Sequence, residues 1–288
     1  MPPKKIIVTD EKKVSEIKAR LRADGAAKLQ VVSDFDKTLT SCFVDGQKIV
    51  SLISILRDEH YLTPDYSAQA QALYDKYHPI EIDPNISLEE KKAKMQEWWT
   101  IHYDLLVKSG LSKSDLKKVT ESKRLALRPG AAELLDFFHE QQIPLVILSA
   151  AGLGSETISL YLERNGLLYD NIFIASNKFI WDEGGKVKGV EEPIIHTFNK
   201  DYSSVKKFPF YKKIEDRKNV ILLGDGLGDA DMIKGFEYDN ILKIGFLNED
   251  IENLATVDSF KKAFDILILD DGPMDYLNNL SKNLVYGS

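Results

Sequence analysis

Apolar residues in this chain gather in short, nearly continuous runs that alternate with stretches of helical spacing. The earliest run, residues 28–33, follows a helical pattern over residues 14–23. Similar runs recur later in the chain, at residues 143–148, 171–175, 219–223, 241–246 and 265–269. Helical patterns such as residues 130–141 and 155–165 separate them. Buried strands that alternate with helices are typical of a parallel sheet covered on both faces.

A polar, mostly helical stretch interrupts this alternation between about residues 45 and 120. It contains an amphipathic run over residues 88–108 and shows no strong strand pattern. Proline-bearing breaks are expected at Pro64, Pro79 and Pro84. We therefore predict an α/β protein whose parallel-sheet core comprises residues 1–44 and 125–288. A mostly helical cap, residues 45–124, is inserted after the first core strand.

The charge balance argues against a polyanionic partner. The formal net charge is −7, and the basic residues are scattered among acidic ones. A protein that binds nucleic acid normally presents a basic face, so we expect no nucleic-acid polymer as a partner. A small phosphate ester remains compatible, because one metal ion and one lysine can reverse the local field.

The cysteine count and the lengths of the apolar runs bear on the compartment in which the protein is found. Cys42 is the single cysteine, so no disulfide can form within the chain. No apolar run reaches the length of about 18 residues that a membrane span needs, and the polar N-terminus lacks a signal-type apolar segment. We expect a cytoplasmic protein without membrane contact, and a monomer is the simplest state.

Polar motifs stand where three of the predicted strands end. Asp34-Phe35-Asp36 follows the first strand, Ser149 follows the strand at 143–148, and a glycine- and aspartate-rich loop at 224–229 follows the strand at 219–223. Ligands of open α/β sheets bind at the carboxyl ends of the strands. These motifs are therefore the candidates for the functional site.

Asp34 and Asp36 offer the chemistry of phosphoryl transfer. Two carboxylates this close together are electrostatically unfavourable unless a cation such as Mg²⁺ neutralises them. One carboxylate can attack phosphorus to form an aspartyl-phosphate, while the other protonates the leaving group and then activates water. The alternative interpretation of Asp-x-Asp is an ordinary polar turn after a strand.

Four further residues could complete such a site. Asp225 and Asp229 could hold or orient the metal opposite Asp34, although Asp229 could also be a helix N-cap. The hydroxyl of Ser149 and the N–H groups after it suit a phosphate oxygen, or a plain turn. Lys200 could neutralise both the nucleophile and the phosphate, although most lysines are simply solvated.

In their order along the chain, these motifs resemble those of the haloacid dehalogenase superfamily of phosphotransferases. Further stretches, spread over about residues 14–269, resemble the type III cytosolic 5′-nucleotidases, also called pyrimidine 5′-nucleotidases. They lie at residues 25–30, 80–84, 97–99, 148–150, 195–200, 222–225 and 241–245. Several of them fall outside the catalytic motifs, so this second resemblance is the more specific one. It implies a Rossmann-like core.

The resemblance also implies a reaction and a role for each site residue. The reaction would be Mg²⁺-dependent hydrolysis of a small-molecule nucleoside 5′-monophosphate, such as CMP, UMP or 7-methyl-GMP. Asp34 would be the nucleophile and Asp36 the general acid and base. The metal ligands would be Asp34, the backbone carbonyl of Asp36 and Asp225, with Asp229 in support. Ser149, Ala150 and Lys200 would hold the phosphate.

Glu81, in the predicted cap, would contact the base under the same resemblance. A carboxylate there can accept a hydrogen bond from an exocyclic amine, such as that of cytosine or of 7-methylguanine. Without the resemblance, Glu81 would be interpreted as an exposed loop acid.

Two residues depart from the pattern of the family. Lys37 stands where the family often has Met, and His102 stands where the family has a substrate-contacting Ser. His102 could replace that contact or end it, so the base preference is open. A phosphatase for phosphoserine, a sugar phosphate or a vitamin phosphate is the nearest alternative. A catalytically silent binding protein would be expected to have lost Asp34, Asp36 or Lys200.

Overall fold

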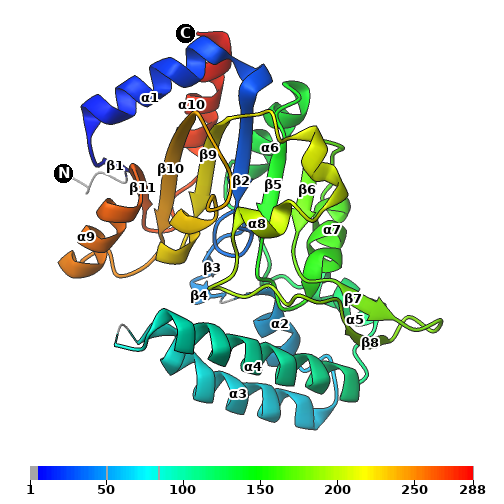
Figure 1. The fold of residues 1–288 in the computed structure, drawn as a ribbon. Coiled ribbons are helices and arrows are strands. Elements are labelled where there is room, and N and C mark those ends of the chain that lie inside the picture. Colours follow the sequence, from blue (N-terminus) through cyan, green and yellow to red (C-terminus); the bar gives the residue numbers. More distant parts are fainter. Residues whose placement is uncertain (1–5, 50, 84, 288) are drawn as a thin grey trace.

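The computed structural model describes residues 6–49, 51–83 and 85–287. Its centre is a seven-stranded sheet of order β1-β11-β10-β9-β2-β5-β6 (Figure 1). The parallel strands are β2 (Leu29–Ser33), β5 (Leu145–Leu148), β6 (Ile172–Ala175), β9 (Asn219–Gly224), β10 (Asn240–Leu247) and β11 (Ile266–Leu269). Each of them coincides with a predicted apolar run, so the sequence prediction of a parallel sheet is confirmed for these strands.

One strand of the sheet was not predicted. β1 (Ile6–Val8) forms one edge of the sheet and pairs with β11 in the antiparallel sense, with Ile7 opposite Leu267. Three residues are too few to show a period, and their partner lies at the other end of the chain. The sheet is therefore mixed at this edge rather than wholly parallel.

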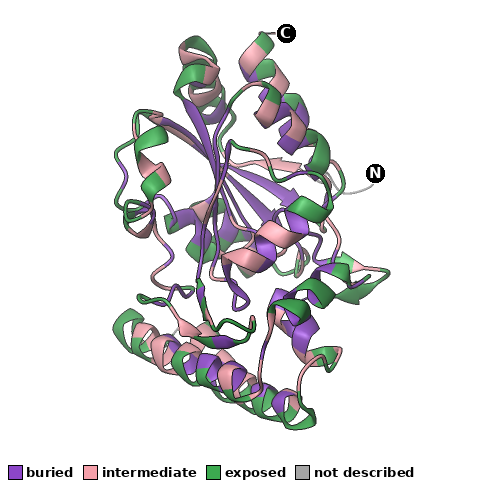
Figure 2. Ribbon diagram, turned by 90° about the vertical axis from the view of Figure 1, so that its right-hand side faces the viewer, coloured by how far each residue is buried: buried purple, intermediate pink, exposed green. Residues whose placement is uncertain are grey.

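Side chains from alternate positions of the strands build two hydrophobic layers. On one face, residues such as Val31 pack with α1 (Glu11–Asp24), α6 (Ala131–Glu140), α7 (Gly154–Arg164) and α10 (Asp275–Tyr286). On the other face, residues such as Val32 pack with α8 (Tyr202–Val205), α9 (Leu254–Ala263) and the 3₁₀ helices η2 (Pro209–Lys213) and η3 (Leu227–Asp231). Because both faces are covered, the central strands are buried throughout (Figure 2).

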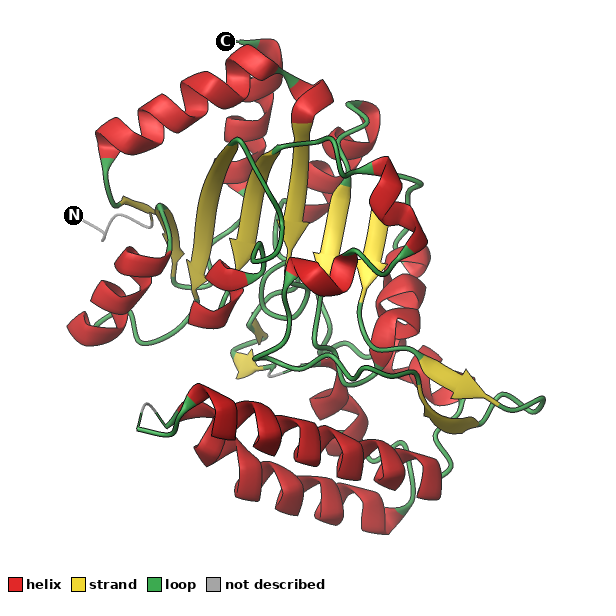
Figure 3. Ribbon diagram, viewed as in Figure 1, coloured by secondary structure: helices red, strands yellow, loops and turns green. Residues whose placement is uncertain are grey.

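The segment between β2 and α6 is mostly helical. It contains α2 (Leu52–Asp58), α3 (Pro64–Ile82), α4 (Leu88–Lys108) and α5 (Lys113–Glu121). The helices α3 and α4 lie side by side beyond the carboxyl ends of the parallel strands (Figures 1 and 3). The bounds of α4 match the predicted amphipathic run, and Ser87 caps the helix by accepting a hydrogen bond from the N–H of Glu90. A short hairpin precedes the helices and was not predicted. In it, β3 (Phe43–Val44) pairs with β4 (Gln47–Lys48).

The predicted break at Pro79 is wrong. The helix α3 continues through Pro79 as far as Ile82. A proline within a helix removes one backbone hydrogen bond, and only the last turn of α3 follows it, where Asp83 still donates to the Pro79 carbonyl. Pro64 fits its prediction better, because it occupies the first turn of α3, where a proline is tolerated. The predicted break at Pro84 lies outside the described residues.

A second hairpin joins the sheet region to the helical segment. It consists of β7 (Phe179–Trp181) and β8 (Val187–Val190). The N–H of Val187 donates to the carbonyl of Leu111, and the N–H of Lys113 donates to the carbonyl of Gly185. The hairpin therefore holds the connection between α4 and α5. Among the described residues, every helix is too short or too polar to span a bilayer.

Candidate active site

The nucleophile candidate is held at the end of β2 by local hydrogen bonds. The N–H of Asp34 donates to the carbonyl of Leu223 on the adjacent strand β9, at 3.0 Å. The N–H of Phe35 donates to Asp34 Oδ1 at 2.7 Å. The ring of Phe35 is fully buried and contacts Tyr161 edge-on. Because neighbouring residues of an extended segment face opposite ways, Asp34 and Asp36 face the site while Phe35 faces the core.

Lys200 links two of the site's carboxylates. Its Nζ lies 2.8 Å from Asp34 Oδ1 and 3.0 Å from Asp229 Oδ1, and its side chain is only 5% exposed. Burial raises the pKa of the Asp34 carboxyl, and the neighbouring charge of Lys200 opposes that rise. The interpretation of Lys200 as a simply solvated lysine is therefore wrong. The ion pair places a positive charge beside the oxygen expected to attack phosphorus.

Asp229 shapes the loop that follows β9. Its Oδ2 accepts hydrogen bonds from the N–H groups of Asp225 and Gly226, at 3.0 and 2.8 Å. Gly226, not Asp229, is the N-cap of η3, so the alternative of Asp229 as the N-cap is wrong. A Cβ at Gly224 would lie 2.2 Å from Asp229 Cβ, which explains why this position needs glycine.

The carboxylates at the ends of β2 and β9 are suited to a divalent cation. One oxygen from each of Asp34, Asp225 and Asp229 lies within 4.8 Å of the others. Lys37 Nζ pairs with Asp225 Oδ2 at 2.7 Å. With Asp36 included, the site holds four carboxylates and two ammonium groups, those of Lys37 and Lys200. The remaining negative charge and the oxygen ligands match the preferences of Mg²⁺.

Asp36 has a different environment from Asp34. Its Oδ1 accepts a hydrogen bond of 3.3 Å from the N–H of Leu52, the first residue of α2. Burial raises the pKa of Asp36 to about 6, and the charge of Lys37 limits the rise. A carboxyl group with such a pKa is partly protonated near neutral pH, as a general acid requires.

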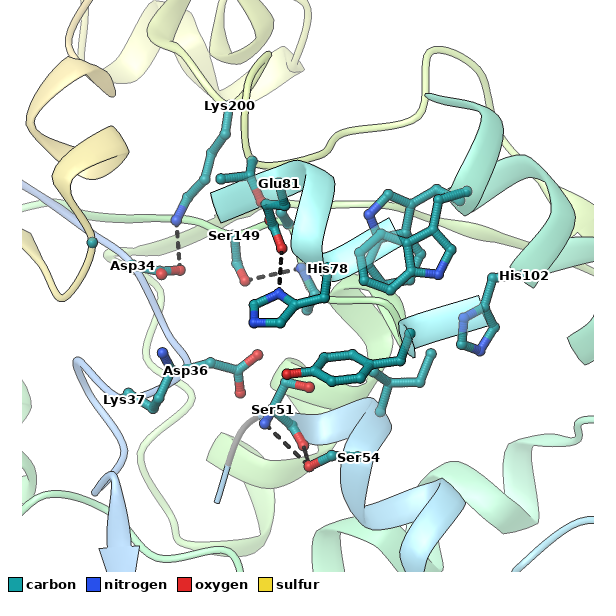
Figure 4. A pocket seen from close by; sticks show the side chains of 18 of the residues that line it. Asp34, Asp36, Lys37, Ser51, Ser54, His78, Glu81, His102, Ser149 and Lys200 are labelled. Carbon is teal, nitrogen blue, oxygen red and sulfur yellow. Dashed lines mark hydrogen bonds and ion pairs between the residues drawn. The ribbon is translucent and has the colours of Figure 1, made fainter. Parts of the chain in front are cut away.

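Ser149 extends the hydrogen bonding of the sheet through its backbone and forms a local turn through its side chain. Its N–H donates to the carbonyl of Ala175 on β6, and its Oγ accepts a hydrogen bond of 3.1 Å from the N–H of Ala151. The hydroxyl therefore does form the local turn that was the alternative interpretation. The side chain of Ser149 also faces the site (Figure 4), which Ala150 lines as well.

A single cavity of about 310 Å³ joins these residues to the helices above the sheet. It is lined by every residue proposed for the site from the sequence: Asp34, Asp36, Glu81, His102, Ser149, Ala150, Lys200, Asp225 and Asp229. Figure 4 shows Asp34 and Asp36 at one end of the cavity and His102 at the other, with Glu81 and His78 between them. The cavity therefore has a charged end and an aromatic end.

Glu81 lies in the last turn of α3, so its interpretation as an exposed loop acid is wrong. Its Oε1 accepts a 2.7 Å hydrogen bond from Oγ1 of Thr197, and its Oε2 lies 3.1 Å from Nδ1 of His78. Burial opposes ionisation of Glu81, but these hydrogen bonds outweigh burial and hold its pKa below the usual value. Thr197 lies three residues before Lys200, so Glu81 is tied to the segment that carries this lysine.

The aromatic end of the cavity is built by α3 and α4. Trp98 stacks on Trp99 with ring centroids 5.6 Å apart, and Trp99 stacks on His102 at the same distance. Nε2 of His102 lies 3.1 Å from the Tyr66 hydroxyl, whereas its buried Nδ1 has no hydrogen-bond partner among the described residues. Burial lowers the pKa of His102 to about 4, so its ring is neutral at physiological pH.

Comparison with known proteins decides the family. Residues 37–285 match the family described as pyrimidine 5′-nucleotidase (UMPH-1). The chain belongs to this family. The chain also matches curated relatives over nearly its whole length. A chicken relative named 7-methylguanosine phosphate-specific 5′-nucleotidase is 34% identical over 266 residues, covering 92% of this chain and 91% of the relative. A human relative of the same name is 33% identical over 281 residues, covering 97% and 92%.

Solved structures agree with this family assignment. Cytosolic 5′-nucleotidase IIIB bound to cytidine superposes with a TM-score of 0.86 at 31% identity, covering 98% of this chain and 94% of that one. A substrate-bound phosphoserine phosphatase superposes with a TM-score of 0.52 at 18% identity, which shows a shared fold only. The resemblance to the pyrimidine 5′-nucleotidases and the expected α/β fold of haloacid dehalogenase type are thereby confirmed.

Several cavity residues of this pyrimidine 5′-nucleotidase family member were not predicted. Tyr74 and His78 lie on the same face of α3 as Glu81 and stack on each other with centroids 4.6 Å apart. From Tyr74 to His78 is four residues and from His78 to Glu81 is three, a spacing that places all three on one face of a helix. This spacing could have identified Tyr74 and His78 from the sequence. Arg57, on α2, also lines the cavity and lies over the Tyr74 ring. No sequence pattern pointed to Arg57.

Proposed function

We propose that the protein is a Mg²⁺-dependent 5′-nucleotidase that splits a nucleoside 5′-monophosphate into nucleoside and phosphate. The observation that carries this proposal is the single cavity. It joins the Asp34–Lys200 ion pair, where a phosphate fits, to an aromatic wall with a carboxylate, where a base fits. Membership of the pyrimidine 5′-nucleotidase family supports the same reaction.

The proposed chemistry begins with attack on phosphorus by a carboxylate oxygen of Asp34. The bond between phosphorus and the 5′ oxygen breaks, and Asp36 gives its proton to that oxygen. In the second step Asp36 takes a proton from water as the water attacks the aspartyl-phosphate. The bond between phosphorus and Asp34 then breaks, which releases phosphate and leaves Asp36 protonated again.

Charge neutralisation supports both steps. Lys200 holds positive charge beside Asp34 throughout, and Ser149 and Ala150 would face the phosphate oxygens. Mg²⁺, held by Asp34, the backbone carbonyl of Asp36 and Asp225, would neutralise charge on the transferring group. Asp229 would orient the loop of Asp225 through its hydrogen bonds to that loop.

The base would lie at the aromatic end, against Glu81. A charged carboxylate there accepts hydrogen bonds from an exocyclic amine, which favours cytosine and 7-methylguanine. The known relatives fit both choices, since one solved relative is bound to cytidine and others are named for 7-methylguanosine phosphate. Residues 45–124 would act as the specificity cap, and we propose a cytoplasmic monomer.

The direct test is phosphate release from a panel of esters, with and without Mg²⁺. The panel comprises CMP, UMP, dTMP, AMP, GMP, 7-methyl-GMP, phosphoserine and glucose 6-phosphate. Mg²⁺-dependent turnover of CMP or 7-methyl-GMP, well above that of the non-nucleotides, is the expected result. Turnover of non-nucleotides alone would overturn the proposed substrate class, and no turnover of any ester would overturn the proposed reaction.

A further inference from the structure

The loop over residues 37–43, which follows Asp36, is called the catalytic loop below. Behind it lies a fully buried arginine, Arg128, whose exposure is 1%. Its Nε donates to the carbonyl of Thr38 at 2.7 Å, and its Nη2 donates to the carbonyl of Lys37 at 2.5 Å. Its Nη1 donates to the carbonyl of Gly272 at 2.8 Å and lies 2.9 Å from Asp271 Oδ1. A buried charge is costly unless it is paired and hydrogen-bonded, so this number of contacts keeps Arg128 in one place.

Two of the three carbonyls that accept from the Arg128 side chain belong to Lys37 and Thr38, the two residues directly after Asp36. Lys37 has a φ of +57°, in the left-handed region that residues other than glycine seldom adopt. Such a conformation persists only where surrounding contacts enforce it. Asn248 adds to the enforcement, because its Nδ2 donates to the same Lys37 carbonyl at 3.0 Å, and its Oδ1 accepts from Arg128.

Asp271, the partner of Arg128, holds the other end of the same loop. Its two carboxylate oxygens accept hydrogen bonds from the N–H groups of Cys42 and Phe43, each at 2.9 Å. Midway between, the N–H of Arg128 itself donates to the carbonyl of Leu39. The ion pair thus holds the loop over residues 37–43 at its start and at its end, and the backbone of Arg128 holds its middle.

We propose that the Arg128–Asp271 ion pair is a positioning device for the reaction. It holds the left-handed turn after Asp36 so that the carboxylates of Asp34 and Asp36 face the cavity together. Arg128 does not line the cavity, so it acts through the loop and does not touch the substrate. The effect on turnover rests on the proposed function, whereas the effect on the loop does not.

Arg217 provides a matched control. It also donates from Nη1 to two carbonyls, of Ala26 at 2.9 Å and of Leu29 at 3.1 Å. Ala26 lies just before β2 and Leu29 is its first residue, whereas the catalytic loop follows the end of the same strand. Arg217→Met and Arg128→Met therefore both remove an arginine that anchors backbone next to β2, but only the second loosens the catalytic loop.

The experiment measures kcat, KM and amide hydrogen exchange for both variants, below the melting temperature of each. Arg128→Met should lower kcat at least tenfold with KM within threefold of wild type, and should speed exchange over residues 34–43. Arg217→Met should keep kcat within twofold and leave exchange over 34–43 unchanged. The proposal is overturned if Arg128→Met keeps kcat within threefold, or if exchange over 34–43 is equally fast in both variants.

A milder variant keeps the proposal testable if Arg128→Met does not fold. Asp271→Asn removes the charge that faces Arg128 and replaces one acceptor oxygen with a donor. It should speed exchange over residues 37–43 and lower kcat about tenfold, and wild-type values of both would overturn the proposal. If the wild-type protein turns over no nucleotide, the proposed function fails, and the exchange data alone then decide whether the ion pair holds the loop.

Discussion

Nζ of Lys37 lies 2.7 Å from Oδ2 of Asp225, although the two residues are far apart in the sequence. Lys37 thus contacts the proposed metal ligand directly, at a position where the family resemblance of the sequence leads us to expect Met. The ammonium group competes with a cation for the same oxygen and repels that cation. The residue at position 37 should therefore influence how tightly the site binds a metal ion.

Lys37→Met should therefore bind Mg²⁺ more tightly than the wild type. We expect the dissociation constant to fall roughly tenfold, because a positive charge next to the site is removed. Isothermal titration of the substrate-free protein measures this directly. Lys48→Met is the matched control, since Lys48 pairs with Glu249 and does not line the cavity. Equal or weaker Mg²⁺ binding by Lys37→Met would show that the ion pair does not oppose the metal.

Asp36 should make the stability of the metal-free protein depend on pH. Burial raises its folded-state pKa to about 6, above the ordinary value of 3.8. A carboxyl group with a raised pKa contributes stability that is fully present below the ordinary value and is lost as pH rises through the folded-state value. Relative to Asp36→Asn, the wild type should lose about 1 kcal/mol of unfolding free energy between pH 5 and pH 8.

Urea unfolding of both proteins in EDTA tests this dependence on pH. Asn can still accept the hydrogen bond from Leu52, so the comparison isolates the charge. A difference between wild type and Asp36→Asn that stays constant from pH 5 to pH 8 would contradict the raised pKa.

Glu81→Gln should weaken the recognition of the base without affecting the chemistry. Gln can keep the hydrogen bond from Thr197 but loses the charge that an exocyclic amine would meet. We expect kcat/KM for CMP or 7-methyl-GMP to fall about tenfold to a hundredfold, which corresponds to a charged hydrogen bond. Ribose 5-phosphate, which has no base, is the control substrate. Equal losses for the nucleotide and for ribose 5-phosphate would remove Glu81 from base recognition.

His102→Ser should change which base is preferred. His102 is neutral, its Nδ1 has no partner among the described residues, and it lines the end of the cavity away from Asp34. Serine is smaller and supplies the hydroxyl that the family resemblance of the sequence leads us to expect here, so the ratio of kcat/KM for CMP to that for 7-methyl-GMP should shift. His139→Ser, on α6 and outside the cavity, controls for the loss of a histidine. An unchanged ratio would exclude His102 as a specificity residue.

The sequence predicted those features that depend on local pattern. The apolar runs became the parallel strands because both faces of the sheet are covered. Motifs at strand ends, such as Asp34-Phe35-Asp36 and Ser149, met at one edge because parallel strands end on the same side. Their roles came from the family resemblance, since no period of hydrophobicity distinguishes a nucleophile from a turn residue.

Features that depend on distant partners were not predictable in this way. The strand β1 forms only because Ile6–Val8 meets β11, which comes far later in the chain. The ion pair of Lys37 with Asp225, and that of Arg128 with Asp271, likewise join segments that only the folded sheet brings together. Pro79 misled the prediction because its cost depends on its place near the end of a helix.

The most direct test of the account is the kcat of Asp34→Asn, with saturating Mg²⁺ and the best nucleotide of the panel. Asn keeps the size of Asp34 and can still accept the N–H of Phe35, but it cannot form the aspartyl-phosphate. The account predicts that kcat falls by at least roughly a thousandfold while the nucleotide still binds. Turnover by Asp34→Asn within about tenfold of the wild type would contradict the proposed nucleophile.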